Sequence, residues 1–188
     1  MKFTMHDVIR DNNPLIREKS KPVTLPLSKE DREILQGLYD YINASVLEEN
    51  QDNDAYRPAV GIAAIQVGIK KRMLSVVLDE YDKNDNLIHH EYALANPEII
   101  SSSIQKSCLR TGEGCLSVEE TIEGQIYRHA RIKIKAYNLL TDKTETIRAR
   151  GFLAVALQHE IDHLDGILFY DHLKDPQPKN IDEVEIIG

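Results

Sequence analysis

Residues 151–166 read GFLAVALQHEIDHLDG, an apolar run followed at once by a cluster of ionisable side chains. The pattern predicts a helix over Phe152–Asp165, because Gly151 precedes the run and Gly166 stands just after it, where a left-handed glycine commonly ends a helix. The apolar residues of Phe152–Leu157 predict that this helix is largely buried. A buried helix that carries ionisable side chains must supply them with partners.

The second half of that helix contains His159, Glu160 and His163 in the H-E-x-x-H spacing. Side chains at i and i+4 lie on one face of a helix, so the two imidazoles can bind one metal ion. Glu160 is rotated away by about 100°, which is too far for a third helix ligand but close enough to take a proton from a water molecule at the metal. The composition of the chain gives only about 0.02 chance matches to this pattern, and we interpret it as a metal-binding helix.

The two histidines leave a third protein ligand to be found elsewhere in the chain. The metzincin pattern requires a histidine at position 169, where this sequence has Phe169, so that class is excluded. The gluzincin pattern requires a downstream glutamate, and Glu183 and Glu185 have a possible spacing. Both glutamates lie in an acidic tail beyond two prolines, however, and we expect that tail to be solvated.

Cysteine is the remaining soft ligand. Cys115 lies in the short segment Glu113–Ser117, which combines small and apolar residues between polar flanks. A thiolate binds divalent metals well, and two histidines with one cysteine leave the fourth position of a tetrahedral site open for water. Cys108 has neither a glycine nor an acid beside it in Lys106–Leu109, and we interpret it as a structural thiol.

The rest of the chain predicts strands ahead of this single late helix. A first helix is expected from Ser28 to about Glu49, because Ser28 can cap it and apolar residues recur at helical spacing. Alternation of apolar and polar residues predicts strands, and the last two form an antiparallel hairpin with one buried face. A polar loop is expected over Gln51–Arg57, and the expected strands are Arg72–Asp79, Tyr92–Ala95, Arg131–Asn138 and Thr144–Arg150. The predicted class is α+β, with antiparallel sheets packed around the late metal-binding helix, in one catalytic domain over residues 1–188.

Composition and charge argue against several functional classes. The chain has 188 residues, 41% of them hydrophobic, which is enough for a substantial core. Its 23 basic and 31 acidic residues give a net charge of −8, which argues against a protein that wraps nucleic acid. No apolar run approaches the ~20 residues of a spanning helix, and the charged start Met1–Arg10 is unlike a signal peptide. With two cysteines and no signal, the sequence predicts a cytoplasmic protein without a disulfide framework.

Three segments of the chain form a recognisable set. They are Val60–Gln66 (VGIAAIQ), Glu113–Ser117 (EGCLS) and Gln158–His163 (QHEIDH). In this order they resemble the three signature motifs of the peptide deformylase family. The sequence departs from the family pattern at Ala59, where a glycine is usual, and the added methyl group is expected to narrow the substrate groove without removing a catalytic group.

The resemblance extends over about Ile9–Leu173, which is nearly the whole chain. The N-terminal segments Asn13–Arg17 and Lys21–Val23 resemble the usual opening of the family. The long stretch Glu48–Arg57 and the extended segment between the first and second motifs resemble the longer deformylases of Gram-positive bacteria.

The resemblance implies an enzyme that removes the N-formyl group from the formyl-methionine of newly made polypeptides and releases formate. It implies that Cys115, His159 and His163 bind the metal. The chemistry of the helix independently supports a hydrolysis, since a metal ion lowers the pKa of a bound water and Glu160 can take the proton of that water.

Four further residues receive roles from the resemblance. The side-chain amide of Gln66 and the backbone N–H of Leu116 are expected to stabilise the oxyanion that develops on the formyl carbonyl. Val60 and Gly61 match the positions along which the substrate backbone lies in a strand-like pairing. A glycine allows that close approach, although Gly61 can also be read as a simple turn residue.

The expected cofactor is one divalent metal ion per chain. Two histidines and one cysteine suit Zn²⁺ on ligand grounds, whereas the resemblance implies Fe²⁺ as the native ion, with Ni²⁺ or Zn²⁺ as substitutes. The expected substrates are N-formyl-methionyl peptides. We expect a monomer that contacts the ribosome transiently at most, with no specificity for nucleic acid and no membrane contact.

Several polar residues keep two interpretations. Glu113 either orients groups around the cysteine or is a buried structural acid. Asp162 either supports a metal ligand or forms a salt bridge on the helix face. Arg128 contacts either the substrate or an acidic neighbour. The other histidines have no ligand spacing and are interpreted as surface or core residues: His6, His89, His90, His129 and His172.

Two other functions fit parts of the sequence. A zinc endopeptidase would use the same helix, but the third ligand of the zincin classes is missing. A degenerate deformylase-like binding module, or a closed structural zinc site, would need the metal ligands alone. Intact Glu160 and Gln66 argue against both non-enzymatic forms, because neither residue is needed merely to hold a metal.

Overall fold

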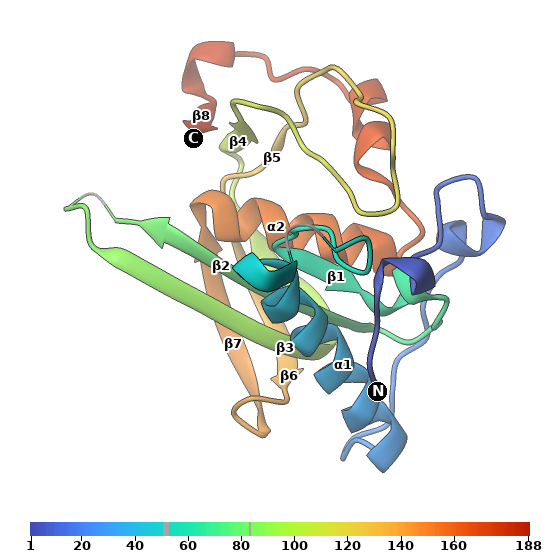
Figure 1. The fold of residues 1–188 in the computed structure, drawn as a ribbon. Coiled ribbons are helices and arrows are strands. Elements are labelled where there is room, and N and C mark those ends of the chain that lie inside the picture. Colours follow the sequence, from blue (N-terminus) through green and yellow to red (C-terminus); the bar gives the residue numbers. More distant parts are fainter. Residues whose placement is uncertain (51–52, 83) are drawn as a thin grey trace.

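The computed structural model describes residues 1–50, 53–82 and 84–188 (Figure 1). Within them a five-stranded sheet has the order β1-β2-β3-β6-β7, and a three-stranded sheet has the order β5-β4-β8. The strands are β1 Gly61–Ala63, β2 Met73–Tyr81, β3 Leu87–Ser102, β4 Lys106–Leu109, β5 Arg128–His129, β6 Arg131–Asn138, β7 Lys143–Arg150 and β8 Glu185–Ile187. The α-helices are α1 Lys29–Ser45 and α2 Gly151–Leu164, and the 3-10 helices are η1 Met5–Asp7, η2 Pro14–Arg17, η3 Glu48–Asn50, η4 Ala64–Val67, η5 Phe169–Lys174 and η6 Ile181–Glu183.

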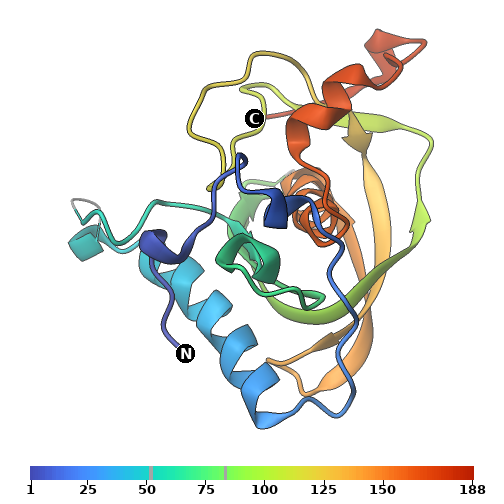
Figure 2. The ribbon, with the colours of Figure 1, turned by 90° about the vertical axis from the view of Figure 1, so that its right-hand side faces the viewer.

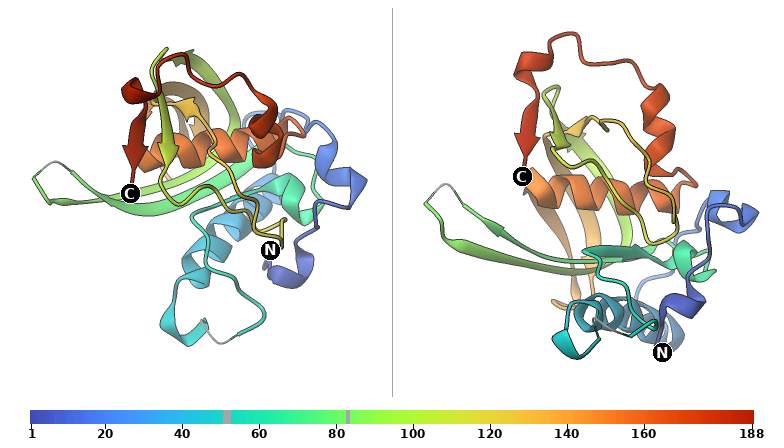
Figure 3. Two further views of the ribbon diagram at one scale, coloured as in Figure 1. Left: turned by 90° about the horizontal axis from the view of Figure 1, so that it is seen from above. Right: turned by 45° about the horizontal axis from the view of Figure 1, so that its top comes forward.

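The elements stack in layers with α2 at the centre. The five-stranded sheet lies on one side of α2 and the small sheet of β4, β5 and β8 on the other (Figures 1 and 3). All strand pairs are antiparallel except β4 with β8. The predicted α+β class, with antiparallel sheets around the late helix, is confirmed.

The large sheet has an apolar core on each face. Neighbouring residues of β2 and β3 alternate between the cores: Leu74, Val76 and Leu94 lie under α2, and Met73, Ala93 and Ala95 lie under α1. This alternation follows from the two-residue period of a strand. Because α1 packs mainly on β1, β2 and β3, it covers only half of its face of the sheet, and β6 and β7 extend beyond it (Figure 2).

The β6–β7 hairpin has the predicted single buried face. Ile134 pairs with Ile147, and Ile132 pairs with Ala149. All four side chains are buried in the core under α2, while the residues between them are exposed. The hairpin confirms the sequence prediction, with β7 beginning one residue earlier than expected.

The first helix begins where predicted and ends early. Ser28 Oγ accepts a hydrogen bond from the Asp31 N–H (3.1 Å) and so caps the first turn. At the other end, the Asn50 side chain donates to the carbonyl of Ala44 (2.9 Å), and the chain turns into η3. The prediction that this helix continues to Glu49 is therefore wrong by about one turn. The loop expected over Gln51–Arg57 lies partly outside the described residues.

Strand β3 is much longer than the four residues predicted. Its first half pairs with β2 and its second half with β6. Register shifts between Ala95 and Glu98, and between Ile99 and Ser101, interrupt the second half. Such bulges bend a strand and break its alternation, which is why the period-2 pattern fades after Ala95 although the strand continues.

The C-terminal tail also differs from the expectation. Glu183 and Glu185 are exposed as predicted, but Glu185–Ile187 form β8 and pair in parallel with β4. The Arg110 side chain donates to the carbonyl of Gly188 (2.6 Å) and fixes the end of the chain. Figure 3 shows this terminus beside β4, at the small sheet. A three-residue strand on a sheet edge leaves no periodic signal in the sequence.

Helix α2 starts at Gly151 and ends before Gly166, which adopts φ +75 as the sequence predicts. Its buried residues include both histidines, Glu160 and most of the apolar run. In the described part of the chain, no helix combines the length and apolar character needed to cross a membrane.

Gly166 is expected to be irreplaceable for packing as well as for backbone conformation. A Cβ atom there would lie 2.2 Å from the carbonyl oxygen of Arg17. Gly68 has the same left-handed conformation (φ +76), but its nearest contact to a Cβ would be 3.8 Å. We expect Gly68→Ala to lower the free energy of unfolding by about 1 kcal/mol and Gly166→Ala by about 3 kcal/mol or more. Urea denaturation measures both, and equal losses would show that the contact with Arg17 is unimportant.

Candidate metal centre and active site

The structure brings together the three predicted metal ligands. α2 presents His159 and His163 one turn apart, and the loop after β4 presents Cys115. The ligand atoms of the three residues all lie within 4.8 Å of one another, and Cys115 Sγ is 3.2 Å from His163 Nε2. Ligand atoms of a tetrahedral site with these donors are about 3.5 Å apart. The donor set and its spacing therefore fit one divalent transition-metal ion.

An acid fixes the orientation of the first histidine. His159 Nδ1 lies 2.8 Å from Glu113 Oε2, which leaves Nε2 to face the other two ligands. Glu113 is also held by the Arg128 guanidinium through two hydrogen bonds of 2.8 and 2.9 Å. Burial alone raises the pKa of Glu113, but the hydrogen bonds from Arg128 and His159 outweigh it and lower the pKa to about 2. Glu113 is therefore an ionised acceptor for the histidine.

The ion-pair cluster continues around α2. Arg128 is only 4% exposed and also contacts Asp162. His172 Nε2 lies 2.7 Å from Asp162 Oδ2 and links η5 to the same cluster. Of the two interpretations left open for each residue, the contacts favour an orienting role for Glu113, an acidic neighbour for Arg128 and a helix-face ion pair for Asp162. The position of His172 in this cluster had no signal in the sequence, because the residues meet only through the fold.

Gln66 faces the cysteine from the opposite side. It lies in η4, directly after the edge strand β1, and is 1% exposed. Its Oε1 accepts a hydrogen bond from the Ala63 N–H (2.8 Å), so the amide NH₂ group points towards Cys115 Sγ (3.5 Å) and Ser117 Oγ (3.3 Å). The backbone bond fixes which end of the amide is the donor. Sequence reasoning missed the contribution of Ser117.

Glu160 is the most unusual acid of the site. Its side chain is buried, and its Oε2 atom has no hydrogen-bond partner within the described residues. Burial raises the pKa of Glu160 to about 7. An uncompensated carboxyl group in an apolar environment is costly and is typical of a group that exchanges protons.

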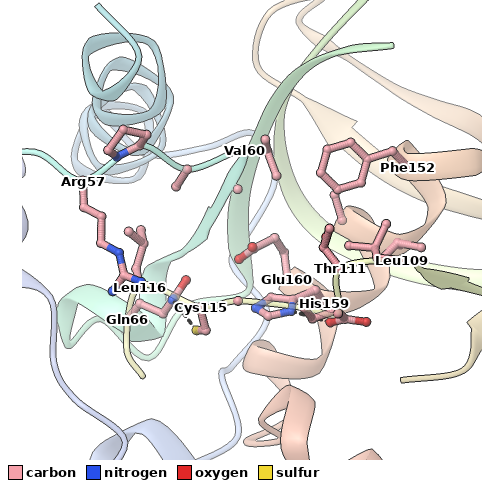
Figure 4. Close-up of a pocket in the computed structure, with 18 residues that line it drawn as sticks. Arg57, Val60, Gln66, Leu109, Thr111, Cys115, Leu116, Phe152, His159 and Glu160 are labelled. Carbon is pink, nitrogen blue, oxygen red and sulfur yellow. Dashed lines mark hydrogen bonds and ion pairs between the residues drawn. The ribbon is translucent and has the colours of Figure 1, made fainter. Parts of the chain in front are cut away.

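Gly61 leaves the space that Glu160 occupies. A Cβ at position 61 would lie 2.5 Å from Glu160 Oε1 and 2.8 Å from its Cδ. Both residues line a cavity of about 340 Å³. Figure 4 shows Glu160 and His159 reaching into this cavity from α2, with Gln66 and Cys115 across from them and Val60 above. The close approach of Glu160 therefore requires a glycine at position 61, which the alternative interpretation of Gly61 as a simple turn residue does not explain.

The other walls of the cavity combine apolar side chains with polar groups. Phe152, Val155 and Ala156 contribute an apolar wall from α2, and Ala59, with the unusual methyl group, also lines the cavity. Leu116 lines the cavity too, and its carbonyl accepts a hydrogen bond from the Arg10 guanidinium (2.9 Å). An apolar pocket with a few convergent polar groups is the usual form of a small-ligand site.

A buried His-Glu-x-x-His helix, completed by a cysteine and opening into a cavity, defines the class of mononuclear metal hydrolases. The comparisons with known proteins are more specific. The family model described as polypeptide deformylase matches residues 5–179. The peptide deformylase of Macrococcus caseolyticus is 44% identical over 179 residues, covering 95% of each chain. Peptide deformylase 2 of Bacillus subtilis is 42% identical over 176 residues, covering 94% of this chain and 93% of that one.

A solved structure supports the same assignment. The Met-Ala-Ser-bound class I type b peptide deformylase from Acinetobacter baumannii superposes with a TM-score of 0.68 at 30% identity, covering 92% of this chain and 98% of that one. The chain belongs to the peptide deformylase family. It is a metal-dependent hydrolase that removes the N-formyl group from newly made polypeptides, and the likeness to the Gram-positive relatives confirms the predicted subclass.

The contact between Gly61 and Glu160 yields a test. In Gly61→Ala the added methyl group must displace the Glu160 carboxyl group, and a displacement of about 1 Å can lower kcat by about 10²-fold. Steady-state kinetics on a formylated peptide measures the loss. The double variant Gly61→Ala/Glu160→Ala is the control: if position 61 acts through Glu160, it will be no slower than Glu160→Ala alone. Additive losses would mean that Gly61 acts on the substrate independently of Glu160.

Proposed function

We propose that this chain hydrolyses the formyl amide of N-formyl-methionyl polypeptides at the Cys115, His159 and His163 centre, with Glu160 as the group that moves the proton. The buried Glu160 carboxyl group, with one unpartnered oxygen beside the three ligands, carries the proposal. A buried carboxyl group with an oxygen that finds no hydrogen-bond partner in the described part of the chain has no evident stabilising role. Its position in the cavity supports a chemical one.

The proposed cofactor is one divalent ion held by the three ligands, with Fe²⁺ as the native ion and Zn²⁺ or Ni²⁺ as substitutes. When bound, such an ion polarises a carbonyl group and lowers the pKa of water. The chain supplies the rest: Glu113 and Arg128 hold His159 in one orientation, and the Cys115 thiolate provides the soft donor. Metal analysis of protein purified without oxygen identifies the native ion.

Glu160 performs the proton transfers. A carboxyl group with a pKa of about 7 accepts a proton from the attacking water near neutral pH and can return it to the leaving amine. The same group thus acts first as base and then as acid. The C–N bond of the formamide breaks, formate leaves, and the peptide keeps a free amino terminus.

The developing oxyanion needs hydrogen-bond donors at fixed positions. Gln66 Nε2 is held towards the centre by the bond between its Oε1 and Ala63. We assign the backbone N–H of Leu116, the residue after Cys115, as the second donor. Both donors come from rigid surroundings, because Gln66 and Leu116 are buried, so little reorganisation is needed during the reaction.

Substrate backbone binds along Val60 and Gly61 in this proposal. β1 is an edge of the large sheet, and among the described strands it pairs with β2 alone, so its other edge can pair with an extended peptide. The side chain of the first residue then enters the apolar part of the cavity. The relative from Acinetobacter baumannii holds Met-Ala-Ser, a peptide that begins with methionine.

We further propose that residues 1–188 act as one catalytic domain, as a monomer in the cytoplasm, with at most transient ribosome contact. The shared position of α1 and α2 on one sheet supports one domain. The endopeptidase alternative lacks support, since the third ligand candidate at the centre is a cysteine. A closed structural site would leave Glu160 and Gln66 without a purpose.

Formate release tests the function. The metal-loaded protein should release formate from a formyl-Met peptide and leave unformylated casein intact. Glu160→Ala should retain the metal and lose activity by about 10²-fold or more, as measured by formate assay and metal analysis on the same samples. Casein cleavage without formate release would establish the endopeptidase, and loss of the metal in Glu160→Ala would show that Glu160 is a ligand.

Gln66 is tested by the separation of kcat from KM. Gln66→Leu keeps the approximate size and removes the donor, and loss of one oxyanion donor lowers kcat by about 10²–10³-fold while KM and metal content stay nearly constant. Ser117→Ala, which removes the other partner of the amide, serves as the control and should keep most of kcat. Normal kcat with a lowered melting temperature would assign Gln66 to structure alone.

A further inference from the structure

The outer face of β6 and β7 carries a group of cations that the catalytic reaction does not use. Arg131, Lys133 and Lys135 alternate along β6 with the buried residues, and Arg148 and Arg150 do so along β7. All five are exposed. We call these five residues the basic sheet face. It lies on the side of the sheet away from α2, because the residues between them are buried in the core under α2.

The basic sheet face is open because α1 stops short of it. α1 packs mainly on β1, β2 and β3, and Figure 2 shows β6 and β7 at the edge of the sheet that this helix does not reach. A surface hollow of about 450 Å³ lies here, with Ser101–Ser103 along its β3 side. Ser101 pairs directly with Lys133 in the sheet register and adds a hydroxyl group to the cationic surface.

The central cations lack close ion-pair partners in the described part of the chain, although Arg150 lies within electrostatic range of Asp82. Within residues 1–50, 53–82 and 84–188, Lys133, Arg148 and Arg150 form no ion pair. At the margins, Glu185 lies 4.0 Å from Arg131, and Glu98 pairs with Lys135 in the register. The chain as a whole has a net charge of −8. A surface whose central cations, Lys133 and Arg148, form no close ion pair is unusual on so acidic a protein, because solubility alone is served by interspersed charges of both signs.

The register makes this face locally unfavourable. Lys133 is directly opposite Arg148, and Arg131 is directly opposite Arg150. Like charges opposite one another on adjacent strands destabilise a sheet, and uncharged β-branched residues would suit these positions better. An anion that bridges the strands would relieve the repulsion. These paired cations lower the stability of the sheet and have no structural role, and such residues are commonly retained because they bind a ligand.

We propose that the basic sheet face binds the phosphate backbone of duplex RNA. Two short rows of cations on adjacent strands match a repeating polyanion better than a single small anion. No aromatic residue lines the hollow, so bases would have nothing to stack on, which favours paired RNA over single strands. A membrane surface is less suited because the outward side chains of the basic sheet face are all cations, and the apolar residues that line the hollow, Ile132 and Ala149, are buried and cannot insert into a bilayer. Such binding ignores base sequence and is compatible with the absence of nucleic-acid specificity expected from the sequence.

The choice of RNA rests on the proposed function. Newly made polypeptides exist at the ribosome, an RNA-rich particle, and a weak contact there would raise the local concentration of substrate. The geometry permits both activities together, since the cavity opens beside α2 and the basic sheet face lies on the opposite side of the sheet.

Fluorescence anisotropy tests the proposal. The metal-loaded protein is titrated into a labelled RNA duplex of about 20 base pairs at several salt concentrations between about 50 and 200 mM. Lys133→Thr/Arg148→Thr should weaken binding by about tenfold or more at low salt and lower the slope of log K against log salt by about 2. Lys2→Thr/Lys19→Thr makes the same charge change at two exposed N-terminal positions and should bind like the parent. Neither pair touches the cavity, so formate release from a free peptide should be unchanged in both.

Melting temperatures add a second readout. The Lys133→Thr/Arg148→Thr protein should melt no lower than the parent, because a like-charge pair is removed. The proposal is overturned if the parent does not bind the RNA, if both double variants weaken binding equally, if a DNA duplex of the same sequence binds more tightly, or if anionic phosphatidylserine vesicles bind and the RNA does not. RNA binding without formate release would leave the basic sheet face standing and refute the proposed function instead.

Discussion

The bidentate ion pair between Glu113 and Arg128 is the contact on which the centre depends. It joins the loop that carries Cys115 to β5, and through His159 and Asp162 it joins both to α2. A buried ion pair is weak support for stability, since well-packed apolar residues often do as well. Its value here is positional. It keeps Glu113 ionised so that His159 holds one orientation with respect to the other two ligands.

The layered fold places this pair out of reach of water. α2 lies between the two sheets, with Leu157 and Ile161 in the core of the large sheet and His159 stacked near Phe169 on the other side. The helix is apolar around most of its circumference, as expected for a central element. Asp162 and the Nδ1 side of His159 therefore meet protein partners, and the low effective dielectric strengthens each of these contacts.

Sequence reasoning reached the elements whose signals are local. The H-E-x-x-H spacing, the alternation of β6 and the glycine after α2 are each contained within about 15 residues, and the structure has all three features. The end of α1, the bulged second half of β3 and the terminal strand β8 were not predictable in the same way, because distant backbone groups determine them. Arg128 and His172 illustrate the same limit at the centre: each is ordinary in its own segment and gains a role only through Glu113 or Asp162.

The net charge of the whole chain does not predict the charge of one face of the molecule. A value of −8 describes the mean over the surface, whereas the field at one face depends on which residues the register places together. The two-residue period that buries Ile132 and Ala149 also forces Lys133 and Arg148 to the outer side, opposite one another. The sequence contains both facts, but the pairing that makes them an interaction comes from the hairpin.

Gly61 connects the sheet edge to the Glu160 carboxyl group. β1 must present bare backbone if an extended peptide is to pair with it, and α2 must bring the Glu160 carboxyl group close to that same backbone. Both requirements fall on one Cα atom, and only glycine meets them together. In the proposed mechanism, the small residue at this position allows the substrate amide, the Glu160 carboxyl group and the three-ligand centre to occupy one cavity, so that a peptide bound along the edge strand would place its scissile bond at the acid.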